Sequence, residues 1–387
     1  MIKKIQAALL FPVVPNYWVR FLRHLSMIST IDVTCFHGKS SKGFGVHSAG
    51  TSLPVKNIWV KNYFYPMGRH RVFWQSSLML LFKGNFDVIV CQEVVHNLAI
   101  WAIWLLGRLY KKRLILFGYG YRPANLPRPF WIMRNFIRKL LLKNADAVIV
   151  YTRQGSDECI RIGMHSKKIF IMNNTLDTEY LMSLQDKIAE EELKEIRDRL
   201  KLSSSHTLLY VGRLLPEKRI DILIESFSML KQSNVDISLL VVGEGTERQR
   251  LLQQAKSLEN IHFVGPIYDD RKLAKFFTIS DLLVIPGRVG LTCVHGFCYG
   301  VPIVTTKHGV EQSPEVAYIT HKKNGYVVNT LDAKCFTEAI LYIINNLNEF
   351  NYMQAGARQT AKSLKIEAMV AQFAAAIEYA AQDNTRL

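Results

Sequence analysis

Short apolar runs rich in β-branched residues alternate with longer segments of helical periodicity, and this alternation restricts the fold more than any other feature. In the first part of the chain the expected strands are 5–11, 31–36, 87–91, 113–118 and 147–151. In the second part they are 207–211, 237–242, 261–263, 282–285 and 303–305. Parallel strands need a crossover connection, which is usually a helix. The pattern therefore predicts an α/β fold with parallel sheets and helices on both faces.

Chain length indicates how many such sheets to expect. The 387 residues exceed the ~150 of a typical domain, and the strand–helix pattern starts again in the second part. We expect two Rossmann-like, doubly wound domains facing each other across a cleft, spanning 1–172 and 173–365. A final Ala-rich helix within 366–387 would pack back on the first domain. Ligands of such sheets bind at the carboxyl ends of the strands.

The net charge of +17 lies entirely in the first 150 residues, which hold 21 Lys and Arg against four Asp and Glu. Of the totals of 49 basic and 32 acidic residues, the rest of the chain keeps 28 of each sign and is neutral. A general nucleic-acid coat would not need such a division. It favours a protein with one basic face for an anionic partner and a neutral part for a small substrate.

Cysteine usage and the amino terminus predict a cytoplasmic protein. The six cysteines form no Cys-x-x-Cys pair, so neither a disulfide framework nor a zinc site is expected. Lys3 and Lys4 precede a short apolar run, but Pro12 and Pro15 interrupt it before a signal peptide could form. The longest apolar stretch, 98–107, falls short of the roughly 20 residues that span a bilayer. Any membrane association is therefore expected to be peripheral.

The first motif with chemical content is V-G-R-L-L-P-E-K at 211–218, between an expected strand and an expected helix. Gly212 allows a tight turn. Arg213 and Lys218 could both reach a diphosphate, one as a planar fork and the other as a point charge. The motif alone fits an ordinary loop with solvated charges equally well.

Two further strand–turn–helix junctions follow. V-V-G-E-G-T-E at 241–247 resembles a phosphate-binding loop, but Glu244 would repel phosphate and suits sugar or ribose hydroxyls better; a simple turn explains it equally well. At 286–302, Gly287 and Gly290 leave main-chain N–H groups at an expected helix N-terminus, which is an anion site. His295 lies on that helix. Its position behind the loop favours a ligand contact over a core histidine.

Taken in order, these motifs resemble the nucleotide-sugar half of the GT-B glycosyltransferases and are similar to family 4, the retaining group 1 transferases. The resemblance rests on G-R-x(4)-K, V-V-G-E-G, F-x-G at 263–265, S-D-L-L-V-I-P-G-x-V-G-L at 280–291, G-V-P-I-V-T-T at 300–306, Pro314-Glu315 and Asn324-Gly325. It covers most of residues 113–330. Each piece is weak by itself, but the order is specific.

The resemblance implies roles for individual residues. Arg213 and Lys218 match the pair that neutralises the donor diphosphate. Gly290, Leu291 and Thr292 match the loop whose main-chain N–H groups hold the distal phosphate.

The chain departs from the family pattern at both of its usual glutamates. His295 stands where most members have the second glutamate, which contacts the ribose, and Gly287 stands at the first. Glu315 is our candidate for a replacement carboxylate, and Glu244 is assigned to the donor site.

In this family the amino-terminal domain binds the acceptor. F-G-Y-G at 117–120 resembles the family's W-G-H-G strand end, with Tyr119 in place of the histidine. A tyrosine hydroxyl could orient a sugar without acting as a base near neutral pH. His96 is a further catalytic candidate. The first loop, F-P-V-V-P-N-Y-W at 11–18, lacks the glycine pair of many members, which favours a different acceptor contact.

Basic and aromatic residues are interleaved at 56–74. Such a segment suits a membrane interface, where aromatic rings lie at headgroup depth and cations meet anionic lipid. Stacking on single-stranded nucleic acid and a solvated loop packed by its own rings are the alternatives.

The resemblance implies a retaining glycosyltransferase that uses a nucleotide-diphosphate sugar and a lipid-linked or surface-polysaccharide acceptor, as in lipopolysaccharide or other polysaccharide biosynthesis. We expect it to be peripheral on the cytoplasmic face of the membrane, held to anionic lipid through residues 1–150, with no nucleic acid as partner. No metal or other cofactor is expected, and the sequence contains no D-x-D triad. A nucleotide-sugar 2-epimerase of the same fold and a basic nucleic-acid-binding protein are the alternative functions.

Overall fold

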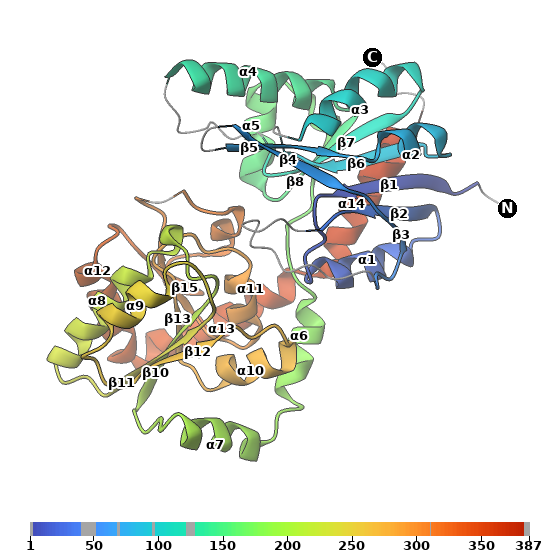
Figure 1. The fold of residues 1–387 in the computed structure, drawn as a ribbon. Helices are drawn as coiled ribbons and strands as arrows, with labels where there is room; N and C mark the ends of the chain where they lie inside the picture. The colour runs from blue at the N-terminus through green and yellow to red at the C-terminus, as the bar shows by residue number, and fades with distance from the viewer. Residues whose placement is uncertain are drawn as a thin grey trace. The chain divides into compact units, whose positions relative to one another are not determined.

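The computed structural model describes residues 3–39, 52–67, 70–94, 97–120, 128–309 and 311–382, in a chain that forms two compact units (Figure 1). Unit 1 consists of Met1–Asn174 and Ile366–Leu387, and unit 2 consists of Thr175–Lys365. The division between Asn174 and Thr175 falls close to the expected boundary after residue 172. The last helix of the chain is part of unit 1.

A parallel seven-stranded sheet forms the centre of unit 1, in the order β3-β2-β1-β6-β7-β8-β9. Its strands are β1 (Ile5–Phe11), β2 (Ile31–His37), β3 (Lys56–Trp59), β6 (Val88–Gln92), β7 (Arg113–Gly118), β8 (Ala147–Val150) and β9 (Ile169–Ile171). Along β1, Ala7 and Leu9 belong to one hydrophobic core and Ala8 and Leu10 to the other. This alternation is that of a strand covered by helices on both faces.

Helices cover the two faces of this sheet. They are α1 (Trp18–Ser26), α2 (Leu78–Lys83), α3 (Leu98–Leu109), α4 (Arg128–Asn144), α5 (Arg153–Arg161) and α14 (Ile366–Ala381). In Figure 1 the red α14 lies beside the blue α1 and β1, and the Phe373 ring on α14 packs edge-on against Phe21 and Phe117. Ile100 and Ile103 on α3 pack on the opposite face. Among the described residues no helix is long and apolar enough to cross a bilayer.

Part of the basic and aromatic segment 56–74 forms a hairpin. β4 (Asn62–Met67) pairs antiparallel with β5 (His70–Gln75), while the preceding β3 joins the large sheet. Phe73 is fully buried and Phe64 packs against it at 5.7 Å between ring centroids. The amide of Gln75 donates to the Phe11 carbonyl over 2.9 Å. The described residues of this segment are therefore regular structure with a packed face and not an irregular loop, and the predicted membrane contact stays a prediction.

Unit 2 has a parallel six-stranded sheet in the order β12-β11-β10-β13-β14-β15. Its strands are β10 (His206–Val211), β11 (Ile237–Val242), β12 (Ile261–Gly265), β13 (Leu282–Val284), β14 (Ile303–Thr306) and β15 (Gly325–Val328). Its helices are α6 (Thr178–Gln185), α7 (Glu190–Arg199), α8 (Ile220–Gln232), α9 (Arg248–Gln254), α10 (Asp270–Thr278), α11 (Thr292–Cys298), α12 (Ala333–Ile344) and α13 (Leu347–Ser363), with short 3-10 turns η2 (Pro216–Lys218) and η3 (Pro314–Tyr318).

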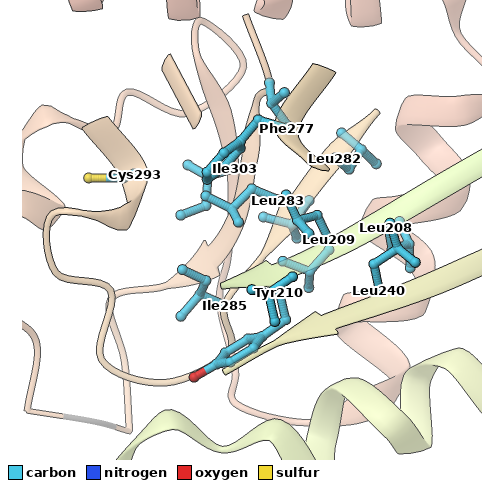
Figure 2. Packing of buried hydrophobic residues seen from close by; sticks show 14 of the residues in the cluster. Leu208, Leu209, Tyr210, Leu240, Phe277, Leu282, Leu283, Ile285, Cys293 and Ile303 are labelled. Carbon is cyan, nitrogen blue, oxygen red and sulfur yellow. The ribbon is translucent and has the colours of Figure 1, made fainter. Parts of the chain in front are cut away.

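The core of unit 2 fixes the ends of its central strands. Leu209 on β10 and Leu283 on β13 are fully buried beside Ile303 and Phe277 (Figure 2). Tyr210 is buried in the same cluster, and its hydroxyl donates to the carbonyl of Arg213 over 2.9 Å. The loop that leaves β10 is therefore anchored to the core at its first turn.

Candidate functional site

The loop after β10 carries the first pair of predicted donor-binding residues. Leu214 is buried, and its N–H donates to the Glu244 carbonyl at the end of β11 over 2.8 Å. Arg219, with φ of 51°, takes up the left-handed conformation between η2 and α8. These constraints leave the Arg213 side chain exposed at the carboxyl end of the sheet, where ligands of such sheets bind.

Lys218 reaches from this loop to the loop after β13. Its Nζ donates to the main-chain carbonyls of Arg288 and, over 3.4 Å, Val289. Burial, together with the positive charges of Arg213 and Arg288, lowers the pKa of Lys218 to about 8. The negative charges of Glu217 and Glu315 offset these effects only in part, and a diphosphate would add the negative charge that this environment favours.

The same two loops are joined through their backbones. Gly287 N–H donates to the Lys218 carbonyl over 3.0 Å, and Arg288 N–H donates to the Glu217 carbonyl over 2.9 Å. A Cβ on Gly287 would overlap the backbone of Glu217 and Lys218. This close approach accounts for a glycine where the family usually has its first glutamate.

The loop that begins α11 supplies fewer donors than the sequence suggested. The N–H of Gly290, whose φ is 73°, donates to Ser313 Oγ over 2.6 Å, and the N–H of Val289 donates to Gln312 Oε1 over 3.0 Å. The Gly290 N–H is therefore already engaged in this conformation, and its predicted contact with a phosphate stays a prediction. Among the described residues, the N–H groups of Leu291 and Thr292 have no hydrogen-bond partner, and they remain the donors that this loop offers.

Glu315 lies in the same cluster as Lys218. It is buried on η3, where its carboxylate interacts electrostatically with Lys218. Burial is the main cause of the raised pKa of Cys293 and Tyr318, and the negative charge of Glu315 adds to it. The structure thus brings Glu315 together with Lys218, although 97 positions separate them in the sequence.

His295 is held within unit 2 by stacking. Its ring lies parallel to that of Phe277, with 5.8 Å between centroids, and its buried Nδ1 has no hydrogen-bond partner in the described part of the chain. Burial lowers its pKa to about 4, so the imidazole is neutral near pH 7. A neutral imidazole can donate or accept a hydrogen bond but cannot balance a phosphate charge.

Glu244 takes a more peripheral position. It is exposed after β11, where its carboxylate pairs with Arg248 over 3.3 Å and accepts the Gly245 N–H over 3.2 Å. Its predicted contact with donor hydroxyls stays a prediction.

The acceptor-side candidates belong to unit 1. Tyr119 follows β7, is half-buried, and its ring packs edge-on against Tyr151 with 5.3 Å between centroids. His96 lies outside the described residues. Sequence reasoning missed Ser313 and Gln312, because no motif marks the residues that hold the loop after β13.

Within the described ranges, no group of three or more His, Cys, Asp or Glu side chains is placed to hold a metal ion. The candidate site at the carboxyl ends of β10 and β13 consists of cations, main-chain N–H groups and one buried carboxylate. Its residues fit an anionic ligand.

Known structures establish the fold class. A glycosyltransferase from Rickettsia africae is 15% identical with a TM-score of 0.74, covering 99% of this chain and 100% of that chain. HepE from Anabaena in complex with UDP is 14% identical with a TM-score of 0.71, covering 96% and 98%. The fold is that of the GT-B glycosyltransferases, as the sequence predicted.

Two family models match successive parts of the chain. The model described as Glycosyltransferase Family 4 matches residues 14–180, and the model described as Glycosyl transferases group 1 matches residues 192–360. The chain has the GT-B fold and is similar to glycosyltransferase family 4 over both matched parts.

Curated relatives are similar over part of their length. An uncharacterized glycosyltransferase of Haemophilus influenzae is 25% identical over 179 residues, which are 45% of this chain and 49% of the relative. A GDP-mannose-dependent alpha-(1-6)-phosphatidylinositol dimannoside mannosyltransferase of Mycobacterium tuberculosis is 28% identical over 167 residues, which are 42% of each chain. The chain therefore spans about half the length, or less, of these relatives.

Proposed function

We propose that this chain moves a sugar from a nucleotide-diphosphate sugar to a lipid-linked or surface-polysaccharide acceptor, at the cytoplasmic face of the membrane. One observation carries the proposal: the Lys218 ammonium donates to the main-chain carbonyl of Arg288 on the loop after β13. There it lies within electrostatic range of the Arg213 and Arg288 guanidinium groups, near the start of α11. The three cations outnumber the nearby carboxylates of Glu217 and Glu315, and the Lys218 ammonium among them is buried. It suits two adjacent phosphates.

The proposed mechanism follows from where charge develops. Breaking the bond between sugar and diphosphate leaves negative charge on the departing phosphate, and groups fixed in advance around that charge lower the barrier. Lys218 and Arg213 would supply the positive charge, and the N–H groups of Leu291 and Thr292 would supply hydrogen bonds. Because these groups are already held by the fold, little reorganisation accompanies the reaction.

We further propose that the anomeric configuration is retained. In a front-face route the departing phosphate takes the proton of the acceptor hydroxyl, so the protein need not provide a base. This agrees with the neutral His295 and with a tyrosine at position 119, neither of which is a strong base near pH 7. The buried carboxylate of Glu315 would accept hydrogen bonds from donor-sugar hydroxyls, in the role we assign to the replacement carboxylate.

Exposed apolar side chains on α4 support a peripheral membrane location. Ile132, Met133, Phe136 and Leu140, which we call the α4 stripe, are exposed and recur at helical spacing, with Phe136 66% exposed. Lys139 and Lys143 lie on the same helix. An apolar stripe accompanied by cations suits the interface of an anionic bilayer.

The printed names of relatives agree with a membrane acceptor. The mycobacterial relative acts on phosphatidylinositol dimannoside, and one solved structure of the same fold is a lipopolysaccharide outer core galactosyltransferase. These names describe those proteins, and they make a glycolipid the first acceptor class to try with this chain.

Hydrolysis and transfer assays with UDP-, GDP- and ADP-sugars test the proposal. Arg213→Ala and Lys218→Met should each lower turnover by about 100-fold or more, because each removes fixed charge from the leaving group. Arg250→Ala is the matched control, since Arg250 is an exposed arginine on α9 that pairs with Glu247, the residue before that helix. Near-normal turnover of the double variant Arg213→Ala/Lys218→Met would overturn the assignment of these residues to the donor diphosphate. Inversion at the second carbon of the donor sugar, without transfer, would indicate an epimerase instead.

A further inference from the structure

Unit 1 contains a buried ion pair between Glu93, directly after β6, and Arg138 on α4. The Arg138 Nε donates to one carboxylate oxygen of Glu93, and its Nη2 donates to the other over 3.0 Å. The side chains of Arg138 and Glu93 are only 9% and 1% exposed. Most other charged side chains of this basic unit are solvent-accessible, so the pair is exceptional in its surroundings.

Stability alone does not explain such a pair. Removing two charges from water costs several kcal/mol per ion, and their mutual attraction often does no more than offset that cost. Apolar side chains of similar volume would pack the same space at equal or lower free energy. The geometry of this pair therefore needs another explanation, which its remaining contacts supply.

The pair holds the turn that carries Tyr119. The Arg138 Nη2 also donates to the Gly120 carbonyl over 2.6 Å. On the other side of Tyr119, the Cβ of Glu93 lies 3.2 Å from the place that a Cβ of Gly118 would occupy. Arg138 thus holds the residue after Tyr119 by a hydrogen bond, and Glu93 lies close to the residue before it.

The start of α5 also packs closely against the same turn. A Cβ on Gly155, at the start of α5, would lie 2.6 Å from the Tyr119 carbonyl oxygen, so the helix approaches the turn as closely as backbone allows. Gly120 has φ of 72° and abuts Gly155 in the same way. The backbone at Tyr119 therefore has little freedom, and its direction follows from the position of Arg138.

We propose that Glu93 and Arg138 are positioning residues, which hold the Gly118–Gly120 turn so that the Tyr119 hydroxyl can hydrogen-bond a hydroxyl of the acceptor sugar. This inference rests on the proposed function, because it assigns the pair to acceptor use. The pair itself does not touch the substrate. It acts by holding Tyr119 in the position from which its hydroxyl can bind and orient the acceptor.

The double variant Glu93→Leu/Arg138→Met tests this role, since it removes both charges together and leaves neither buried alone. We expect a melting temperature close to that of the wild type and a fall of about tenfold or more in the ratio of transfer to donor hydrolysis. The probes are octyl glycosides of glucose, galactose, mannose and N-acetylglucosamine as acceptors, with UDP-, GDP- and ADP-sugars as donors. Wild-type levels of transfer in this variant would overturn the proposal.

A double-mutant cycle with Tyr119→Phe separates positioning from a general structural role. If the pair acts through the tyrosine hydroxyl, adding Glu93→Leu/Arg138→Met to Tyr119→Phe should cause little further loss. Losses that multiply would show that the pair acts elsewhere and would contradict the proposal.

Two controls match the chemistry of the change. Arg113→Met/Asp146→Leu removes a partly buried ion pair of 3.4 Å at the opposite end of β7 and should leave the ratio unchanged. Asn135→Leu replaces a buried amide on α4 whose atoms have no hydrogen-bond partner among the described residues, and it tests repacking of the same helix. A wild-type chain that neither hydrolyses a donor nor glycosylates any octyl glycoside would contradict the proposed function itself, whereas wild-type transfer retained in the variant contradicts only the positioning role.

Discussion

The ammonium of Lys218 donates to the main-chain carbonyl of Arg288, so that a side chain from the loop after β10 is seated on the loop after β13. The reverse connection is made by the Arg288 N–H, which donates to the carbonyl of Glu217, next to Lys218 in sequence. The two loops therefore form one rigid structure at the carboxyl ends of adjacent strands. A ligand that binds to one loop is therefore expected to affect the position of the other.

Donor binding should depend on pH through Lys218. Its pKa is lowered to about 8 by burial and by Arg213 and Arg288, and a bound diphosphate would raise it again. Below pH 8 the ammonium is already charged and binding is at its strongest. As the pH rises above 8, binding must first protonate the amine, so the affinity for UDP or GDP should fall by up to about tenfold per pH unit.

Isothermal titration calorimetry at pH 7 and pH 9, in buffers of different ionisation enthalpy, checks this expectation. Proton uptake on binding should be detectable near pH 9 and nearly absent at pH 7. Lys218→Arg is the control, because a guanidinium keeps its charge throughout this range and should remove the dependence. Equal affinities of the wild type at the two pH values would show that Lys218 does not face the diphosphate.

Restoring the usual family residue at position 287 should damage the protein. A side chain there would overlap the Glu217 and Lys218 backbones and break the two hydrogen bonds that join the loops. We expect Gly287→Ala to lower the melting temperature and to weaken nucleotide binding, and Gly287→Glu to do both more severely. Gly107→Ala within α3 is the control, since its Cβ would meet only the Lys112 carbonyl, at 3.3 Å, and alanine favours the helix. Unchanged binding in Gly287→Ala would refute the close approach of the loops.

His295 should remain neutral in the folded protein near pH 7. Its lowered pKa should decrease the free energy of unfolding as the pH falls into the acid range. Its folded pKa of about 4 lies below the ordinary value of 6.5, so the unfolded chain binds the proton first as the pH falls. The free energy of unfolding should therefore decrease between pH 6.5 and pH 4, by on the order of 1 kcal/mol per pH unit from this group. Chemical denaturation of wild type and His295→Phe isolates this effect. Parallel pH profiles of the two proteins would contradict it.

The α4 stripe should mediate binding to anionic vesicles. Met133→Ser/Phe136→Ser should weaken sedimentation with phosphatidylglycerol vesicles by at least tenfold, because each large apolar side chain contributes about 1.5–3 kcal/mol when buried. Leu347→Ser/Tyr352→Ser on α13 is the control, since these side chains are equally exposed but lie in the other unit. Salt should weaken wild-type binding by screening Lys139 and Lys143. Binding to RNA with no binding to vesicles would favour the nucleic-acid alternative.

The strands and the order of the motifs could be predicted from the sequence, because both are local. A run such as Ile237–Val242 is buried on both faces and is therefore apolar at every position except Ser238. β9 (Ile169–Ile171) and β15 (Gly325–Val328) were not predicted.

The parts of the site that could not be predicted depend on contacts between distant residues. Gly287 has no room for a side chain because of Glu217, which lies 70 positions earlier. The Gly290 N–H is taken by Ser313, which no loop motif includes. In the sequence, Arg138 is one of several cations on a basic helix. Only the folded chain brings Glu93 into an ion pair with it.

The last helix of the chain has a consequence for biosynthesis. Unit 2 ends at Lys365, whereas unit 1 is completed only by α14, whose Phe373 fills the core between Phe21 and Phe117. Domains generally begin to fold while the ribosome is still adding residues. Unit 2 therefore has its whole sequence available before unit 1 does, and the earlier-made part of unit 1 has one face of its sheet covered by α1 but not by α14 until α14 is synthesised.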